Sequence, residues 1–137
     1  MPGPLNRSQS LELPAQPSAA SHARRHVRRV LSQWGREELI DTAELVISEL
    51  VTNAVKATPI DALAEVGTTE IIWMNIYRWG EATVLEVWDC SRTPPVQKRA
   101  GLDEECGRGL QIVDILAKDW GYRWPRAGGK ILWCTLV

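Results

Sequence analysis

Hydrophobic and polar positions recur along the chain with two different periods, and these periods predict its helices and strands. Within residues 20–34 the apolar positions fall three and four apart, which predicts a helix that ends before Gly35. A second helix is predicted over residues 41–58, with Asp41 and Glu44 as a capping pair at its start and Pro59 after its end. Two helices therefore precede any strong strand signal.

The next segments favour strands. Residues 70–79 and 82–89 are rich in β-branched and aromatic residues and are separated by Gly80 and Glu81, which predicts a hairpin. A loop is expected over residues 90–108. After it the predicted elements are a helix over 109–119 and a hairpin of strands 121–124 and 130–137 around the turn PRAGG.

This order of elements favours an α+β fold. Helices and hairpins are segregated along the chain, so we expect a two-layer sandwich with the helices on one face of a largely antiparallel mixed sheet. Residues 1–18 hold four of the eight prolines and are expected to form a flexible tail, within which residues 9–13 could add an edge strand. Residues 19–137 then form one domain.

Composition and charge narrow the function classes. The chain has 137 residues, 45% of them hydrophobic and 24% charged, as in ordinary globular domains. A formal net charge of −1 gives no support to a general affinity for nucleic acid. We find neither a long apolar run nor a signal-peptide pattern, so we expect no membrane association and a cytoplasmic location.

The three cysteines predict no structural site. Cys90, Cys106 and Cys134 are odd in number, widely spaced and without a CxxC pair, so neither a disulfide framework nor a zinc site is indicated. We expect free thiols.

Two polar residues stand out in the second predicted helix, within the stretch ELVISELVTNAVKAT. Glu49 and Asn53 are four residues apart and therefore project from one face. An amide and a carboxylate oxygen stacked in this way can hold a hard cation such as Mg²⁺. The alternative is an exposed polar seam on the helix.

Asp89 is a second candidate, because it ends an apolar row on a strand. A carboxylate at that place needs a hydrogen-bond donor, either from the protein or from a ligand such as the amino group of a purine. In the alternative interpretation Asp89 only ends the strand and caps the loop.

A third candidate is the Gly-x-Gly in CGRGLQIVDIL. Gly107 and Gly109 allow close approach of the backbone, and the amides of a helix that begins near Leu110 favour an anion such as a phosphate. Glycine pairs before helices are frequent, so this pattern is weak by itself.

The order of these features resembles the GHKL, or Bergerat-fold, superfamily of ATP-binding domains in gyrase, MutL and histidine kinases. The stretches SELVTNAVKAT, VLEVWDCSRTPP, GRGLQIVDILAKDWGY and GGKILWCTLV are similar to the small serine kinases of the anti-sigma-factor type. The resemblance covers nearly the whole chain, from about residue 9 to residue 137.

The resemblance implies ATP and Mg²⁺ as cofactors and assigns roles to residues. Asn53 would be the magnesium ligand and Glu49 the general base or water-positioning group. Asp89 would accept a hydrogen bond from the adenine amino group. The remaining nucleotide-binding residues would be Ser91, Gly107, Arg108, Gly109, Leu110 and Thr135, with residues 94–107 as the lid.

The chain departs from the family pattern at the first glycine box. The family has Asp-x-Gly-x-Gly, whereas this chain has Asp89, Cys90, Ser91, Arg92 and Thr93, so both glycines are replaced. A β-carbon where the backbone approaches adenine narrows the pocket or changes the path of the loop.

The first helix carries two rows of arginines, Arg24 with Arg28 and Arg25 with Arg29. A solvated face is the simplest interpretation. The resemblance implies instead that Arg24 contacts protein partners, namely an anti-anti-sigma protein of the STAS type, a sigma factor or both, and that the protein forms a homodimer.

Three functions remain at this point. The first is an ATP-dependent serine/threonine kinase that phosphorylates an anti-anti-sigma antagonist and regulates a sigma factor. The second is a non-catalytic ATP-binding adaptor that binds protein partners. A histidine kinase is disfavoured, because His22 and His26 lie on the first predicted helix and no phosphoacceptor helix pair precedes the domain.

Overall fold

The fold is seen in a computed structural model that describes residues 8–58, 70–91 and 104–136, with only the backbone for 104–109. In chain order the elements are β1 (Gln9–Pro14), α1 (Ala19–Gln33), the 3₁₀ helix η2 (Glu37–Leu39), α2 (Ile40–Ala57), β2 (Ile71–Trp79), β3 (Ala82–Asp89), α3 (Glu104–Leu116), β4 (Asp119–Arg123) and β5 (Lys130–Leu136).

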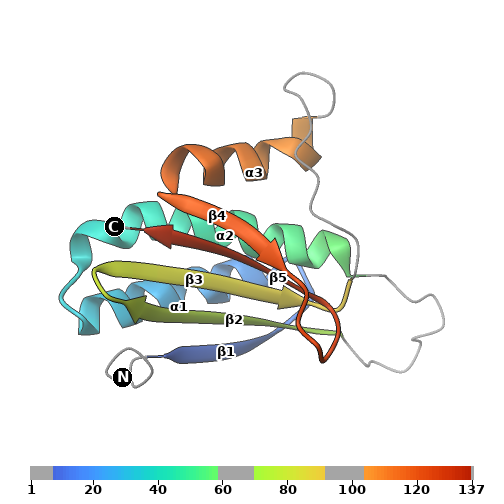
Figure 1. The fold of residues 1–137 in the computed structure, drawn as a ribbon, viewed down its shortest axis with the longest axis horizontal. Helices are drawn as coiled ribbons and strands as arrows, with labels where there is room; N and C mark the ends of the chain where they lie inside the picture. Colours follow the sequence, from blue (N-terminus) through green and yellow to red (C-terminus); the bar gives the residue numbers. More distant parts are fainter. Residues whose placement is uncertain (1–7, 59–69, 92–103, 137) are drawn as a thin grey trace.

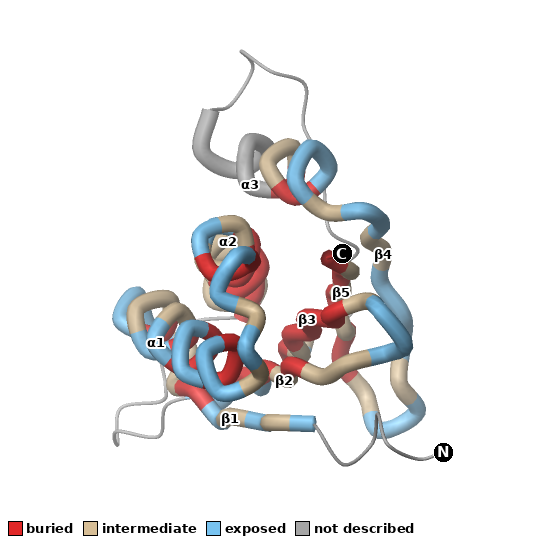
Figure 2. Tube along the Cα trace, turned by 90° about the vertical axis from the view of Figure 1, so that its left-hand side faces the viewer, coloured by how far each residue is buried: buried red, intermediate tan, exposed pale blue. Residues whose placement is uncertain are grey.

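The strands form one sheet in the order β1-β2-β3-β5-β4. Figure 1 shows α1 and α2 behind this sheet and α3 beyond β4, and Figure 2 shows the helices on one side of the strands. The predicted two-layer α+β sandwich is therefore confirmed. All pairings among the described strands are antiparallel, so within this part of the chain the sheet is not mixed.

The core lies between the sheet and the helices, and Figure 2 shows the buried residues gathered there. Period-two alternation places Ile72, Met74 and Ile76 of β2 on the inner face, where they are at most 1% exposed. Leu50 of α2 and Val113 of α3, both fully buried, belong to the same core cluster. Burial of this apolar area drives the packing of the two layers.

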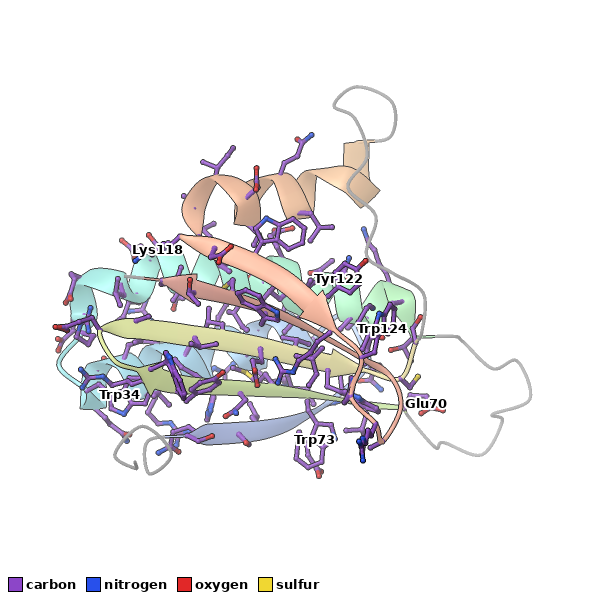
Figure 3. All side chains as sticks on the ribbon, viewed as in Figure 1. Trp34, Glu70, Trp73, Lys118, Tyr122 and Trp124 are labelled. Atoms are coloured by element: carbon purple, nitrogen blue, oxygen red, sulfur yellow. The ribbon has the colours of Figure 1, made fainter. Side chains whose placement is uncertain are left out.

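The outer face of the sheet carries tryptophans. Trp73 is 44% exposed and Trp79 65% exposed, and both alternate with the buried residues of β2. Trp73 is labelled in Figure 3. A polar group lies in the middle of this face, where the Glu86 carboxylate pairs with Arg123 at 2.9 Å and accepts a hydrogen bond from the Tyr77 hydroxyl.

Several helices and strands begin or end at other residues than the sequence predicts. The candidate edge strand is present as β1, which pairs with β2, so the sheet includes residues that we assigned to the tail. Helix α2 begins at Ile40 without a side-chain cap, because its N-cap is Leu39, and the carboxylate of Glu44 pairs with Arg28 of α1 at 2.8 Å. Helix α3 begins at Glu104, inside the predicted loop, and β4 begins at Asp119.

The described cysteines are free thiols, as predicted. Cys90 is exposed and Cys134 is buried in the core. Burial raises the pKa of Cys134 to about 12, and burial also raises the pKa of Cys90 above its ordinary value. Cys134 is therefore a protonated core residue at neutral pH.

His26 is a buried polar residue between α1 and β1. Its Nε2 lies 3.3 Å from the carbonyl oxygen of Gln9, and Arg29 donates to Nδ1 at 2.8 Å. These partners select the neutral tautomer with hydrogen on Nε2, because Nδ1 must accept. Burial lowers the pKa of His26, the Gln9 carbonyl opposes this, and the charge of Arg29 lowers the pKa further.

A lowered pKa predicts loss of stability in acid. As pH falls below about 6.5, the unfolded chain binds a proton at His26 before the folded chain does, so the free energy of unfolding decreases down to the folded-state pKa. Urea unfolding between pH 7.5 and 5 should show a smaller decrease for His26→Gln than for the unchanged protein. The matched variant His22→Gln, at an exposed position of α1, should retain the full decrease.

Candidate functional site

Strand β3 ends and strand β5 begins at the same end of the sheet (Figure 1). The last residue of β3, Asp89, lies opposite the first residue of β5, Lys130, in the antiparallel register. The C-terminal half of α2 and the first turns of α3 lie at the same end. The four stretches on which the family resemblance rests lie on or next to these four elements.

Both carboxylate oxygens of Asp89 have hydrogen-bond donors within the protein. Its Oδ2 accepts a hydrogen bond from Lys130 Nζ at 2.7 Å, and its Oδ1 accepts one from the backbone N–H of Ser91 at 2.8 Å. The side chains of Asp89 and Lys130 are 2% and 1% exposed. Asp89 therefore ends strand β3 and caps the following turn. This is the second of the two interpretations that the sequence leaves open for this residue.

Lys130 is the residue that the sequence analysis missed. Strand β5 has the burial pattern of strict alternation, and its inner positions are Lys130, Leu132, Cys134 and Leu136. A lysine in phase with three core residues has to be buried with a partner, and here that partner is Asp89. This alternation was the signal in the sequence that indicated a buried pair.

The turn before Lys130 is fitted closely to this pair. Gly129 has φ 77°, and a β-carbon there would lie 2.3 Å from the carbonyl oxygen of Asp89 and 2.5 Å from Nε1 of Trp88. The same indole N–H donates to the carbonyl oxygen of Gly128 at 2.8 Å. Glycine is required at position 129, because any other residue adds both strain and a clash.

Glu49 and Asn53 lie on one face of α2, as their spacing predicts, and both are partly exposed. Among the described residues neither side chain makes a hydrogen bond or an ion pair. Their oxygens are therefore available to a ligand. In the same described part of the chain, no group of three or more His, Cys, Asp or Glu residues could hold a metal ion.

The glycine pair lies within α3, whereas the sequence analysis placed it before the helix. Because α3 starts at Glu104, the amides of residues 104–106 lack an intrahelical acceptor, whereas those of residues 107–110 fall inside the helix. Two glycines cost a helix about 1 kcal/mol each, which the burial of Leu110 and Val113 offsets. The side chain of Arg108 and most of the predicted lid lie outside the described residues.

Thr135 is not brought to the site. It pairs with Val84 on β3 and shares the outer face with Trp133, whereas Asp89 and Lys130 lie on the inner face. Five residues of strand separate Thr135 from Lys130, or roughly 16 Å at the usual rise. Thr135 therefore cannot close a pocket around Asp89.

The two arginine rows of α1 have different surroundings. Arg24 donates to the Ser48 hydroxyl of α2 at 2.9 Å, and Arg28 pairs with Glu44, so this row binds α2. The second row, Arg25 and Arg29, lines a groove of about 440 Å³ between α1 and β1. The other residues of the groove are Leu11, Glu12, Leu13, Pro14, His22 and His26.

Two aromatic residues lie at the end of β4, at the same end of the molecule (Figure 3). Tyr122 and Trp124, labelled in Figure 3, pack edge to face with their ring centroids 5.5 Å apart. Trp120, on the same face of β4 as Tyr122, donates its indole N–H to Asp114 of α3 at 2.9 Å. That bond attaches α3 to the edge of the sheet.

Comparisons with known proteins agree with this architecture. None of the helices in the described part of the chain is long and apolar enough to cross a membrane. No curated protein matches the chain. The family described as the histidine kinase-like ATPase domain matches residues 13–136, which include every described element from the end of β1 to β5. The chain belongs to the family of histidine kinase-like ATPase domains.

Proposed function

We propose that this protein is an ATP-dependent serine/threonine protein kinase of the anti-sigma-factor type, which phosphorylates an anti-anti-sigma antagonist. The observation that supports this most is the pair Glu49 and Asn53. They project from one face of α2 and have no partner among the described residues. In a family of ATPase domains, oxygens kept free beside the end of the sheet fit a magnesium-nucleotide site.

The residues of this chain fit the phosphate end of a magnesium-nucleotide better than its base end. At the phosphate end, the Asn53 amide oxygen would hold the metal ion, which takes its other ligands from phosphates and water. At the base end, the carboxylate of Asp89 already accepts hydrogen bonds from Lys130 and Ser91. A site with an open adenine acceptor therefore does not fit these residues.

The proposed chemistry at this site needs little from the protein beyond positioning and proton transfer. Bound ATP with Mg²⁺ would supply the γ-phosphoryl group and its electrophilic phosphorus. Glu49 would accept the proton of the attacking serine hydroxyl as the new P–O bond forms and the bond to ADP breaks. Asn53 would orient the metal ion and through it the phosphates.

The partner surface in this proposal is α1. Arg24 is half-buried against Ser48, one residue before Glu49, so a partner that contacts Arg24 would lie beside α2. The groove with Arg25 and Arg29 adds basic groups that complement acidic side chains of a protein. The homodimer expected from the resemblance is part of the same proposal.

The kinase proposal predicts different effects of substitutions at Glu49 and Asn53. Glu49→Gln should retain nucleotide affinity and lower the rate of phosphoryl transfer by about 10²–10⁴-fold, because a base acts in the transition state. Asn53→Ala should lose magnesium-dependent affinity. Labelled ATP, Mg²⁺ and purified candidate antagonists, with detection of phosphoserine, measure the transfer, and calorimetry measures the affinity.

A matched control is Glu81→Gln, in the exposed turn between β2 and β3. It should behave like the unchanged protein in both measurements. Equal losses of affinity in Glu49→Gln and Asn53→Ala would contradict the division of roles. Binding without transfer to any antagonist would favour the second candidate, a nucleotide-binding adaptor, which the engagement of Asp89 by Lys130 supports.

A further inference from the structure

We propose that Lys130 determines base selectivity at this site, and that the protein binds ATP and GTP with similar affinity. The inference rests on the nucleotide-binding part of the proposed function. The resemblance to the family implies that Asp89 accepts a hydrogen bond from the adenine amino group. In this chain the Asp89 carboxylate and the Lys130 ammonium form a buried ion pair at 2.7 Å.

Two features of the geometry oppose a hydrogen bond from a base to the Asp89 carboxylate. Each carboxylate oxygen of Asp89 already has a donor, Lys130 Nζ on Oδ2 and the Ser91 N–H on Oδ1. The whole residue is 1% exposed, so no open carboxylate edge is available to a base. A hydrogen bond from the adenine amino group would have to compete with a charge-assisted bond inside the protein.

Lys130 also changes the polarity of the base end. An ammonium carries three N–H donors, and among the described residues Asp89 supplies its one acceptor. Because both side chains are at most 2% exposed, the pair presents neither a free acceptor to adenine nor a free donor to guanine. The ion pair is neutral overall and therefore favours neither base strongly.

Lys130 is held in this position by the fold. It is the first residue of β5, directly opposite Asp89 in the register, and it follows Gly129, whose backbone lies against the Asp89 carbonyl. Its inward direction is set by the alternation that buries Leu132. Rotation of the ammonium away from Asp89 would leave two unpaired buried charges, which is strongly unfavourable.

The direct test compares ATP with GTP on the unchanged protein by calorimetry with Mg²⁺ present. We expect dissociation constants within about threefold of each other. A hydrogen bond to a charged group corresponds to roughly ten- to hundredfold in affinity, so an open Asp89 acceptor would appear as an ATP preference of that size. A preference for ATP of thirtyfold or more would overturn the inference and leave the kinase proposal intact.

Lys130→Met tests the residue itself, since it removes the charge at nearly constant length. Asp89 then lacks its donor and the adenine amino group can replace it, so ATP should be preferred over GTP by tenfold or more. Lys130→Arg, which keeps the charge opposite Asp89, is the matched control and should retain the similar affinities. An unchanged ratio in folded Lys130→Met would contradict the inference.

Two further outcomes separate the inference from the proposed function. If the unchanged protein binds ATP and GTP with similar affinity but transfers no phosphoryl group to any antagonist, the inference stands and the kinase proposal fails. If neither the unchanged protein nor Lys130→Met binds a nucleotide while both are folded, the inference and the kinase proposal fail together. Circular dichroism establishes folding of each variant before titration.

Discussion

Asp89→Asn should lower the free energy of unfolding by about 3–5 kcal/mol, because it leaves the Lys130 ammonium buried without a counter-charge. For a chain of this length that loss corresponds to a fall in Tm of roughly 10–20 °C. Lys130→Met should have an effect of the same size for the reverse reason. Urea unfolding monitored by tryptophan fluorescence measures both.

The double variant Asp89→Asn/Lys130→Met identifies the cause. Removing both charges leaves no unpaired ion, so the double variant should be less destabilised than the sum of the single variants by about 2 kcal/mol or more. The exposed pair Arg36 and Glu38, 2.8 Å apart, gives the comparison. Substitution of either Arg36 or Glu38 should change the free energy of unfolding by at most about 1 kcal/mol, as for other surface ion pairs. Additive effects at Asp89 and Lys130 would show that the two side chains do not interact.

Gly129→Ala should cost about 2–4 kcal/mol of stability. The residue adopts a left-handed conformation, which disfavours a β-carbon by about 1–2 kcal/mol. The added atom would also meet the backbone oxygen of Asp89 at 2.3 Å, and relief of that clash requires the turn to move at further cost. Thermal unfolding measures the loss.

Gly128→Ala is the matched control for Gly129→Ala. Gly128 also has a positive φ, of 107°, but a β-carbon there meets nothing within 4 Å. Only the conformational cost applies, so the loss should be about 1–2 kcal/mol. If the two variants were equally destabilised, close packing at position 129 would not contribute.

Most of the fold could be predicted from periodicity. Helix α1 and strand β3 lie within one residue of their predicted bounds, because Gly35 follows the apolar period of α1 and Gly80 precedes the β-prone run of β3. The start of α3 could not be predicted, since the local preference of Gly107 and Gly109 against helix was overcome by the packing of Leu110 and Val113.

Contacts of the candidate site could be predicted where both residues lie on one helix, but not where the residues lie on two different strands. Glu49 and Asn53 share a face by helical spacing alone. The contact of Asp89 with Lys130 spans 41 positions of sequence and depends on the register between β3 and β5. Alternation along β5 assigns Thr135 to a face of the sheet. Its distance from Asp89 depends on the register between β3 and β5, which the sequence does not give.

The buried ion pair also limits which sequences this chain can reach by single mutations. A variant with only Asp89 or only Lys130 replaced has a free energy of unfolding several kcal/mol lower. The two positions should therefore change together. In an alignment of relatives, a basic residue at the first position of the last strand should accompany an acid at the end of β3. Relatives with a small residue at that first position should instead be the ones that have kept both glycines after the acid.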